Sequence, residues 1–529
     1  MSEGRGPESE ASHRTTDGGS GESHPILQRA GLILGPILGA IVYAAMPDSL
    51  GHPPRAAAAI GVLMAIWWMT EAVALPVTSL IPAALFPLFG VVDARTACAP
   101  YANEIIFLFA GGLVLGLAMQ RCGLHVRIAL ITIALVGTRP KRLIAGFMLA
   151  TALMSMWVSN TATAVMMLPI GASVVDLVKS HARGGGEESA RQARNFAVCL
   201  MLAIAFGASI GGIGTLIGTP PNLVFAGYIK QAYGQEIDFM RWMRVGVPMV
   251  AVYLPIAWAV LVYIAFPVRM KEIPGGRELI LNELRELGKP VRSEWIVLGV
   301  FLAAVMLWVF RSRLDDIHAL RFLGDGVIAM CAALVLFFVP RGRVGPAGQP
   351  PGASGGMVMD WATASKLPWG VLLLFGGGLS LGGAMTATNL DGWIGELFTG
   401  MGGLHPVVLV AILVVAVVGL SELASNTAVA TALMPVLGAA AVGLGVHPYV
   451  LLLPAVLASS CGLMLPVATP PNTVVFASGH VGVRDMVKAG FLLDVVGIVL
   501  VIVVATTVAG PLLGEDLSIV PEWAGAKSP

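Results

Sequence analysis

The chain contains a series of apolar stretches long enough to cross the hydrocarbon core of a bilayer. A helix needs about 20 predominantly apolar residues to do so. Such stretches occupy residues 29–46, 56–75, 76–95, 105–120, 195–217, 244–266, 294–310, 324–339, 369–388 and 489–513. Backbone N–H and C=O groups inside a membrane must hydrogen-bond within their own segment, so we expect these stretches to be helices. The chain is therefore predicted to be an all-α polytopic membrane protein.

The charge content excludes several other classes of protein. Only 12% of the 529 residues are charged and 56% are hydrophobic, which is too little charge to cover a soluble globule of this size. The formal net charge of +1 leaves no basic footprint for nucleic acid. The five cysteines lack the spacing of a metal site, so we expect them to be small core residues.

Two polar motifs each occur twice within the apolar part of the chain. Ser-Asn-Thr-Ala occupies Ser159–Ala162 and again Ser425–Ala428. Thr-Pro-Pro-Asn follows each copy, at Thr219–Asn222 and at Thr469–Asn472. Burying a hydroxyl or an amide without a partner is costly in an apolar environment. The repetition therefore favours a site for a polar ligand over the alternative, polar residues that only hold helices together.

The two halves of the chain are copies of one another. The sequence LFAGGL at Leu108–Leu113 matches LFGGGL at Leu374–Leu379. The same spacing superimposes Asn160 on Asn426 and Pro169 on Pro435. Internal repeats of this kind are common in membrane transporters.

Basic residues indicate how the first copy enters the membrane. Cytoplasmic loops collect Lys and Arg, and both flanks of the first Ser-Asn-Thr are basic, around Arg139 and around Arg191. A straight helix over residues 143–178 would be about 54 Å long, whereas the hydrocarbon core is about 30 Å thick. A re-entrant hairpin with Ser-Asn-Thr at its turn fits both the length and the charges.

The second copy is predicted to enter from the opposite face. No Lys or Arg occurs between Lys366 and Arg484, so the flanks of its hairpin, near His405 and His447, are expected to be external. The two repeats are then inverted. Hairpins that enter from opposite faces bring their polar turns together near the middle of the membrane, where transporters bind their substrates.

The Thr-Pro-Pro-Asn motifs are predicted to break the helices that contain them. Proline has no N–H and clashes with the preceding turn, so Pro220 and Pro470 release backbone carbonyls upstream and begin a new helix. Released carbonyls suit a small hard cation, and the free N–H groups of a helix start suit an anion. Each half of the chain therefore offers a place for both kinds of ion.

An acidic substrate at these motifs would meet no fixed positive side chain. Neither residues 143–178 nor residues 406–483 contain Lys or Arg. An unpaired carboxylate in a medium of low dielectric constant costs several kcal/mol even after relaxation. A sodium ion in each half would supply the missing charge, and anion binding would then depend on the cations.

These motifs, together with two others, resemble the divalent anion:sodium symporter family, which carries dicarboxylates, citrate or sulfate. The further motifs are Trp67–Ala72 with Leu75–Thr78, and Pro368–Gly370 leading into the glycine run Gly376–Gly378. The resemblance covers nearly all of the chain after the N-terminal tail. It implies a homodimer, and an elevator motion in which hairpins and broken helices slide as one body against a fixed scaffold.

The resemblance also implies which residues bind the ions. A first sodium site would use Ser155, Ser159, Asn160 and Gly218, and a second Ser421, Ala424, Asn426 and Ala468. The substrate would contact Asn160, Thr161, Thr219, Pro220, Asn426, Thr427, Thr469 and Pro470.

The expected organisation is about 11 transmembrane helices and two re-entrant hairpins. Its parts are a disordered tail (1–27), scaffold helices (28–138), a first transport part (139–267, hairpin 143–178, break 218–222), a polar loop (268–293), scaffold helices (294–400), a second transport part (401–515, hairpin 406–446, break 468–472) and a tail (516–529). We expect a multi-pass protein of the cytoplasmic membrane with its N-terminus in the cytoplasm.

The function predicted is sodium-coupled symport of a divalent anion, most simply a C4 dicarboxylate such as succinate, malate or fumarate. A sodium-independent dicarboxylate exchanger and a sulfate transporter are the alternatives on the same fold. An intramembrane enzyme is disfavoured because no nucleophile with a base, paired acids or metal ligands suggests itself. Glu422, beside the second motif, could carry a proton or could brace its hairpin through hydrogen bonds.

Overall fold

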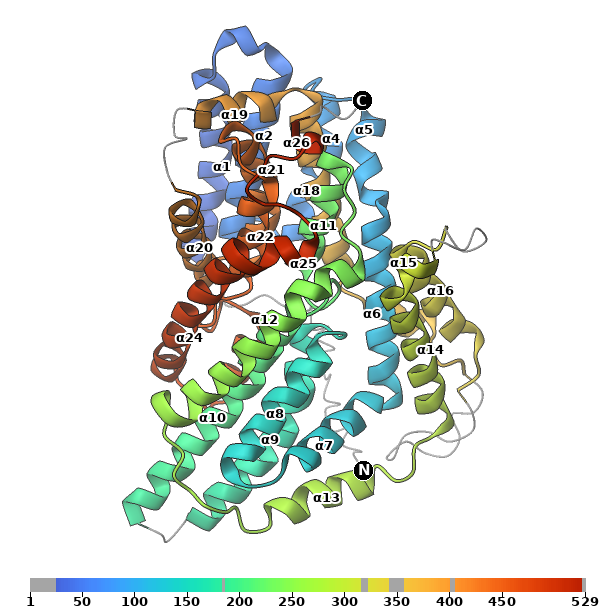
Figure 1. The fold of residues 1–529 in the computed structure, drawn as a ribbon, viewed down its shortest axis with the longest axis vertical. Coiled ribbons are helices and arrows are strands. Elements are labelled where there is room, and N and C mark those ends of the chain that lie inside the picture. Colours follow the sequence, from blue (N-terminus) through green and yellow to red (C-terminus); the bar gives the residue numbers. More distant parts are fainter. Residues whose placement is uncertain (1–24, 183–185, 315–321, 342–355, 400–404, 526–529) are drawn as a thin grey trace, which may run out of the picture.

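The protein is helical throughout the part of the chain that the structure describes. This computed structural model describes residues 25–182, 186–314, 322–341, 356–399 and 405–525 (Figure 1). Within these ranges the one bridge of β type joins Pro340 and Met357. The all-α prediction is confirmed. Residues 1–24 of the predicted tail 1–27 lie outside the described residues. Residues 526–529 of the predicted tail 516–529 also lie outside them.

The first half of the chain forms twelve α-helices. They are α1 (Pro25–Ala45), α2 (His52–Thr70), α3 (Leu75–Thr78), α4 (Ile81–Leu88), α5 (Ala94–Cys98), α6 (Glu104–Cys122), α7 (Leu124–Val136), α8 (Pro140–Ser155), α9 (Asn160–Ala182), α10 (Gly186–Gly212), α11 (Pro220–Tyr233) and α12 (Phe239–Ala259).

The second half repeats much of this order after α13, which lies in the expected polar loop. Its helices are α13 (Gly276–Glu286), α14 (Arg292–Val309), α15 (Arg311–Leu314), α16 (Asp325–Phe338), α17 (Trp361–Ala364), α18 (Trp369–Ala387), α19 (Leu390–Thr399), α20 (Pro406–Leu423), α21 (Asn426–Gly443), α22 (Pro448–Ser459), α23 (Pro470–Ala477), α24 (Val483–Val503), α25 (Ala509–Leu513) and α26 (Glu522–Gly525).

Ten helices among the described residues are long and apolar enough to cross a membrane, and four apolar helices are shorter. The stretch 76–95, expected as one span, is split into α3 and α4. Pro82 begins the second of these helices, and the Ser79 hydroxyl donates a 2.6 Å hydrogen bond to the Leu75 carbonyl at the break. A proline start and a satisfied carbonyl explain why the chain turns here instead of continuing.

Two antiparallel helix pairs lie in opposite halves of the molecule. The pair α8–α9 lies in the lower part of Figure 1 and the pair α20–α21 in the upper part. Helix α10 packs on α8 and α9, and α22 packs on α20 and α21. Each pair therefore lies beside the helix that follows it in its own repeat.

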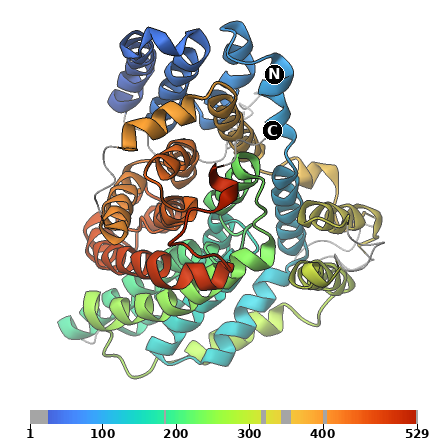
Figure 2. The ribbon, with the colours of Figure 1, turned by 45° about the horizontal axis from the view of Figure 1, so that its top comes forward.

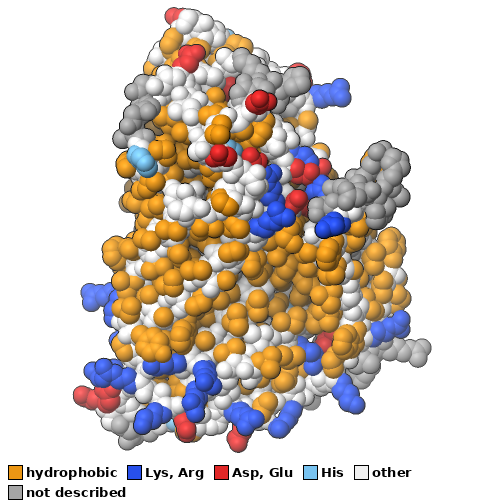
Figure 3. All heavy atoms as spheres, in the orientation of Figure 1, with side chains coloured by type: hydrophobic (Ala, Val, Ile, Leu, Met, Phe, Trp, Pro, Cys, Tyr) orange, Lys and Arg blue, Asp and Glu red, His pale blue; other side chains and the backbone are white. Residues whose placement is uncertain are grey.

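The remaining long helices surround these pairs. Helix α18 contacts α2, α3, α4 and α5, and α6 packs against α14 and α16. Helix α1 packs on α2 at the margin of the molecule, which Figure 2 shows in the turned view. An apolar belt crosses the face drawn in Figure 3, and Lys and Arg gather below it, at the end where α9, α10 and α13 lie.

The glycine runs of α6 and α18 allow close helix packing. A Cβ on Gly111 would lie 2.6 Å from the backbone carbon of Ala329 on α16, and one on Gly377 would lie 2.4 Å from the Ser79 carbonyl oxygen. No side chain fits at such distances without moving backbone, so glycine is required at both positions.

A buried ion pair joins α7 to the start of α14. The Arg127 guanidinium donates to both carboxylate oxygens of Glu294, at 2.7 and 3.1 Å. It also donates to the carbonyls of Gly288 and Leu287, at 2.9 and 3.2 Å, after the end of α13. The side chains of Arg127 and Glu294 are only 10% and 8% exposed, so each charge depends on its partner.

We expect Arg127→Met to destabilise the protein by about 3–5 kcal/mol, because it leaves the Glu294 carboxylate buried and unpaired. Thermal unfolding in detergent should show a clearly lowered melting temperature. The double variant Arg127→Met/Glu294→Leu leaves no unpaired charge and should recover most of the loss. Equal losses in the single and the double variant would show that the ion pair is not what matters here.

Candidate functional site

Both Thr-Pro-Pro-Asn motifs begin a helix after an unwound segment. Residues 213–219 separate α10 from α11, and residues 460–469 separate α22 from α23. Thr219 and Thr469 precede the prolines in nearly the same extended conformation, with φ of −143° and −137°. The Thr469 hydroxyl accepts a 3.3 Å hydrogen bond from the Asn472 N–H, as an N-cap does.

The asparagine of each motif holds the carbonyls of the unwound segment before it. The Asn222 amide donates to the carbonyls of Gly212 and Thr215, at 3.1 and 2.7 Å. The Asn472 amide donates to those of Leu463 and Leu465, at 3.2 and 3.0 Å. Sequence reasoning did not assign these two asparagines, although their place in a repeated motif was a signal that could have found them.

In the first hairpin, several oxygens surround the side-chain amide of Asn160, which begins α9. One amide atom of Asn160 lies 2.6 Å from the Ser155 hydroxyl, 3.1 Å from the Gly218 carbonyl oxygen and 3.3 Å from the Ala208 carbonyl oxygen; it is the oxygen in one orientation of the amide and the nitrogen when the amide is turned by 180°. Three acceptors around one point suit either an NH2 donor or a small hard cation with the amide oxygen turned inward. The structure thus gathers three of the four residues predicted for the first sodium site.

The fourth predicted residue, Ser159, lies at the start of the same helix. Its hydroxyl accepts a hydrogen bond of 3.4 Å from the Ala162 N–H. The Ala208 carbonyl was missed from the sequence, because a backbone oxygen carries no mark of residue type. The residues around Ala208 on α10 are all buried, so burial does not single out this carbonyl. Only the fold shows that it faces the hairpin.

The second hairpin presents acceptors without partners. The Ser421 hydroxyl and the Asn426 amide oxygen are both buried and form no hydrogen bond within the described residues. A buried polar atom without a partner costs about 1–3 kcal/mol, so a bound ligand that uses it is favoured. The unwound segment packs closely against this hairpin, because a Cβ on Gly462 would lie 3.2 Å from the Ser421 carbonyl group.

The other two residues predicted for the second sodium site lie on the same two segments. Ala424 ends α20, and Ala468 lies near the end of the unwound segment. Both are buried, at 8% and 3% exposure. Backbone carbonyls at these places are the type of ligand that broken helices offer to sodium.

The halves meet at the threonines. Helix α11 packs on α21 of the other repeat, and α23 packs on α9. The Ser209 hydroxyl on α10 lies 3.5 Å from the Thr469 hydroxyl, which links the first repeat to the second motif. Thr219 and Thr469 are both buried, at 5% and 2% exposure.

The remaining predicted substrate contacts differ in exposure. Thr161 and Pro470 are exposed, and Pro220, Thr427 and Asn426 are half-buried. The predicted substrate contacts therefore range from exposed side chains to the buried Thr219 and Thr469. Such a gradient suits a ligand that enters from water and is bound at a buried floor.

Glu422, His447 and His480 each have a partner within the protein. Both carboxylate oxygens of Glu422 accept backbone hydrogen bonds from the unwound segment, at 2.8 Å each. His447 caps α22 by accepting from the Tyr449 N–H at 3.1 Å, and His480 lies 3.0 Å from the Lys179 ammonium. No group of three His, Cys, Asp or Glu side chains that could hold a metal occurs among the described residues.

Comparison with known proteins identifies the family. The family model described as the sodium:sulfate symporter transmembrane region matches residues 30–514. The chain belongs to this family of divalent anion:sodium symporters. As a member of the family it is a membrane transporter and not an enzyme.

Two relatives in this symporter family are named for a more specific function. The chain is 40% identical over 499 residues to the sodium-dependent dicarboxylate transporter SdcS of Staphylococcus saprophyticus, covering 94% of both chains. It is 38% identical over 493 residues to SdcS of Staphylococcus aureus, covering 93% of both.

Two solved structures share the fold of this symporter. They are the YdaH transporter of Alcanivorax borkumensis and MtrF of Neisseria gonorrhoeae, each with a TM-score of 0.53 and 14% sequence identity. They cover 90% of this chain, and 97% and 94% of their own. At this identity the likeness concerns the fold alone.

We expect Gly212→Ala to remove stabilisation by sodium from the first hairpin. A Cβ on Gly212 would lie 2.6 Å from the Asn160 amide, so the methyl group must push that amide away from its oxygen partners. The sodium concentration at the midpoint of thermal stabilisation should rise at least about tenfold. This corresponds to a loss of about 1.4 kcal/mol in the free energy of sodium binding. Gly419→Ala on α20 is the matched control, because a Cβ there meets nothing within 4 Å. A sodium response equal to that of the control would contradict the site.

Proposed function

We propose that the protein carries a C4 dicarboxylate such as succinate, malate or fumarate across the cytoplasmic membrane together with sodium. The observation that carries this proposal is the pair of oxygen-rich half-sites, one at each hairpin, in segments without Lys or Arg. The names of the two SdcS relatives support both the cation and the class of substrate.

Binding of the anion then depends on the cations. The carboxylates would contact the hydroxyls of Thr219 and Thr469, together with Asn160, Thr161, Asn426 and Thr427, while Pro220 and Pro470 shape the floor. The starts of α11 and α23 add favourable dipoles, each worth roughly 0.3–1 kcal/mol near a surface. This is less than the several kcal/mol that desolvation of a carboxylate costs, so sodium must supply the difference.

Two related functions remain as alternatives on the same fold. Sulfate, the anion in the description of the family, is also recognised by hydroxyls, amides and helix N-termini. A sodium-independent exchanger would keep full speed in sodium-free counterflow, whereas the proposed symporter would not. The homodimer and a cytoplasmic N-terminus, both expected from the sequence, stay predictions.

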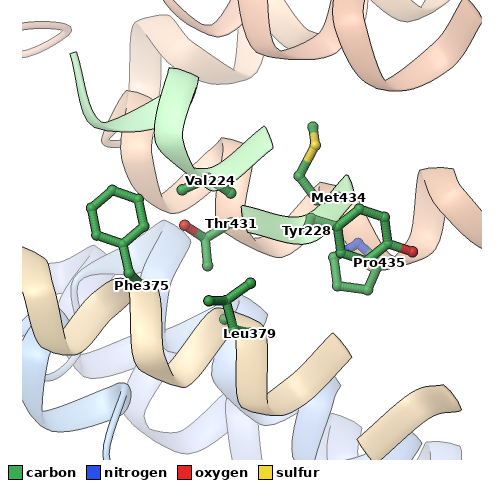
Figure 4. Close-up of a pocket in the computed structure, with 8 residues that line it drawn as sticks. Val224, Tyr228, Phe375, Leu379, Thr431, Met434 and Pro435 are labelled. Carbon is green, nitrogen blue, oxygen red and sulfur yellow. The ribbon is translucent and has the colours of Figure 1, made fainter. Parts of the chain in front are cut away.

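An elevator movement is the transport mechanism that we propose, with α8–α12 and α20–α24 sliding as one body. Figure 4 shows the seam where α11 and α21 meet α18, a small cavity among mostly apolar side chains that include Val224, Phe375 and Leu379. Apolar contacts have no preferred direction, so sliding along this seam would break few specific bonds.

Two ion pairs among the described residues cross between the two proposed bodies. The Lys230 ammonium at the end of α11 pairs with the Glu104 carboxylate at the start of α6, with side chains 33% and 57% exposed. The Arg311 guanidinium on α15 donates to both carboxylate oxygens of Glu236, in the loop before α12, at 2.9 and 3.1 Å. Exposed ion pairs contribute only about 0–1 kcal/mol, but the Arg311 side chain is 13% exposed, so its pair is the stronger of the two. The proposed movement has to break both pairs.

Thermal-shift measurements with sodium and a panel of anions test the proposed function. We expect succinate, malate or fumarate to raise the melting temperature in sodium and to have little effect without it, because a ligand that binds the native state stabilises it. We expect Asn160→Ala and Asn426→Ala to abolish sodium-stimulated uptake in proteoliposomes while the protein stays folded.

The control for these variants is Asn282→Ala on α13, whose side chain is exposed and accepts a hydrogen bond from Arg285. Uptake at the normal rate in either hairpin variant would remove the site assignment. Stabilisation by sulfate, and not by the dicarboxylates, would favour the sulfate alternative.

A bulky side chain on the seam should slow transport without preventing binding. A Cβ on Gly378 of α18 would lie 2.1 Å from the methyl group of Thr431 on α21. We expect Gly378→Val to reduce the uptake rate at least about tenfold, since overpacking of a close contact costs about 1–3 kcal/mol. Sodium and anion should still raise its melting temperature. Gly299→Val on α14, where a Cβ meets nothing within 4 Å, is the control; an unchanged uptake rate in Gly378→Val would argue against sliding at this seam.

A further inference from the structure

Two buried acidic side chains lie beside the second unwound segment, and neither belongs to the proposed ligands. Glu422 on α20 is 3% exposed, and Asp494 on α24 is 5% exposed. Their carboxyl groups are within hydrogen-bonding reach of each other. Buried acids at such a place need a physical explanation, because the desolvation of a carboxylate is costly.

The two acids hold three consecutive backbone N–H groups. The Leu463 N–H donates to Asp494 at 3.0 Å, and the N–H groups of Met464 and Leu465 donate to the two oxygens of Glu422 at 2.8 Å. Both oxygens of Glu422 therefore accept from the backbone. Bonds of this kind to a charged acceptor are roughly twice as strong as neutral ones.

The first and the third of these residues are also held through their carbonyls. The Asn472 amide donates to the carbonyls of Leu463 and Leu465. Since three N–H groups and two carbonyls have partners, the conformation of this stretch is constrained from both sides. It leads directly to Ala468, a proposed ligand of sodium.

The first repeat solves the same problem without acids. Glu422 corresponds to Met156, whose carbonyl accepts a hydrogen bond from the Thr215 hydroxyl in the first unwound segment. Helix α10 also continues to Gly212, whereas α22 ends at Ser459, so the second unwound segment is the longer one. The acids therefore occur in the repeat whose unwound segment has more backbone to hold.

We propose that Glu422 and Asp494 are positioning residues of the second sodium half-site. Glu422 follows Ser421 in the chain and binds the segment that carries Ala468, so it fixes the two sides of the half-site relative to each other. Its charge also favours a nearby cation. This inference rests on the proposed function, and it makes the two half-sites unequal, with the second held by charge and the first by neutral groups.

Asparagine and glutamine variants of the full-length protein distinguish positioning from simple bracing. In Asp494→Asn the side-chain oxygen still accepts from the Leu463 N–H. In Glu422→Gln an NH2 group must face a backbone N–H, and the charge is lost. Met156→Leu, at the matched position of the first repeat, is the control.

The measurement is a sodium titration followed by thermal shift in detergent, without any anion. We expect Glu422→Gln to raise the sodium concentration at the midpoint at least about tenfold, the equivalent of losing one hydrogen bond to a charged group. Asp494→Asn and Met156→Leu should stay within about twofold of the unmodified protein. If Glu422→Gln does not fold, Asp494→Leu takes its place and should show the same rise relative to Asp494→Asn.

The outcomes separate the hypotheses. A lower melting temperature in Glu422→Gln with an unchanged sodium midpoint would show that the acids only brace the fold, and would overturn the inference. An equal rise in Asp494→Asn would also overturn it, because that variant keeps the hydrogen bond from the Leu463 N–H. If sodium does not stabilise the unmodified protein at all, the proposed function fails, and the inference fails with it.

Discussion

The centre of this molecule depends on hydrogen bonds to backbone N–H and C=O groups that an uninterrupted helix would pair by itself. Each Thr-Pro-Pro-Asn motif interrupts a helix in apolar surroundings, where an unpaired N–H or C=O costs several kcal/mol. The structure compensates with side chains from the same motif and from the adjacent hairpin. Asn222 and Asn472 hold carbonyls in both halves, and Thr473 donates a 2.8 Å hydrogen bond to the carbonyl of Pro466. Because these partners come from separate elements, the breaks and the hairpins depend on one another.

This dependence crosses the boundary between the repeats. Helix α11 packs on α21 and α23 packs on α9, so the second part of each broken helix lies against the hairpin of the other repeat. The hydroxyls of Ser209 and Thr469 lie close together at the same boundary. A repeat on its own would leave these faces uncovered. On the proposed function, the duplicated sequence builds one site from two incomplete halves.

Much of this could be predicted from the sequence, for physical reasons. The apolar stretches predicted the helical membrane class, because bilayer thickness leaves few other solutions. The repeated motifs predicted the family through their resemblance to its known members. The split between α3 and α4 was missed, although Pro76, Pro82 and Pro87 within the stretch 76–95 were a signal for it. The Ala208 carbonyl could not be predicted as a ligand, because a backbone oxygen is not specified by residue type. Asp494 was missed, although an acid within the apolar stretch 489–513 was a signal. That Asp494 and Glu422 bind the same unwound segment could not be predicted, because the two residues lie far apart in the chain.

The likeness of the two halves bears on the shape of the proposed substrate. Thr219 and Thr469 precede their helices with nearly the same backbone angles, so each half would contribute a similar threonine to the proposed site. A molecule with identical ends, such as succinate or fumarate, would meet the same surroundings whichever end entered first. It could then bind in two indistinguishable ways, whereas a molecule with a head and a tail would have to choose one.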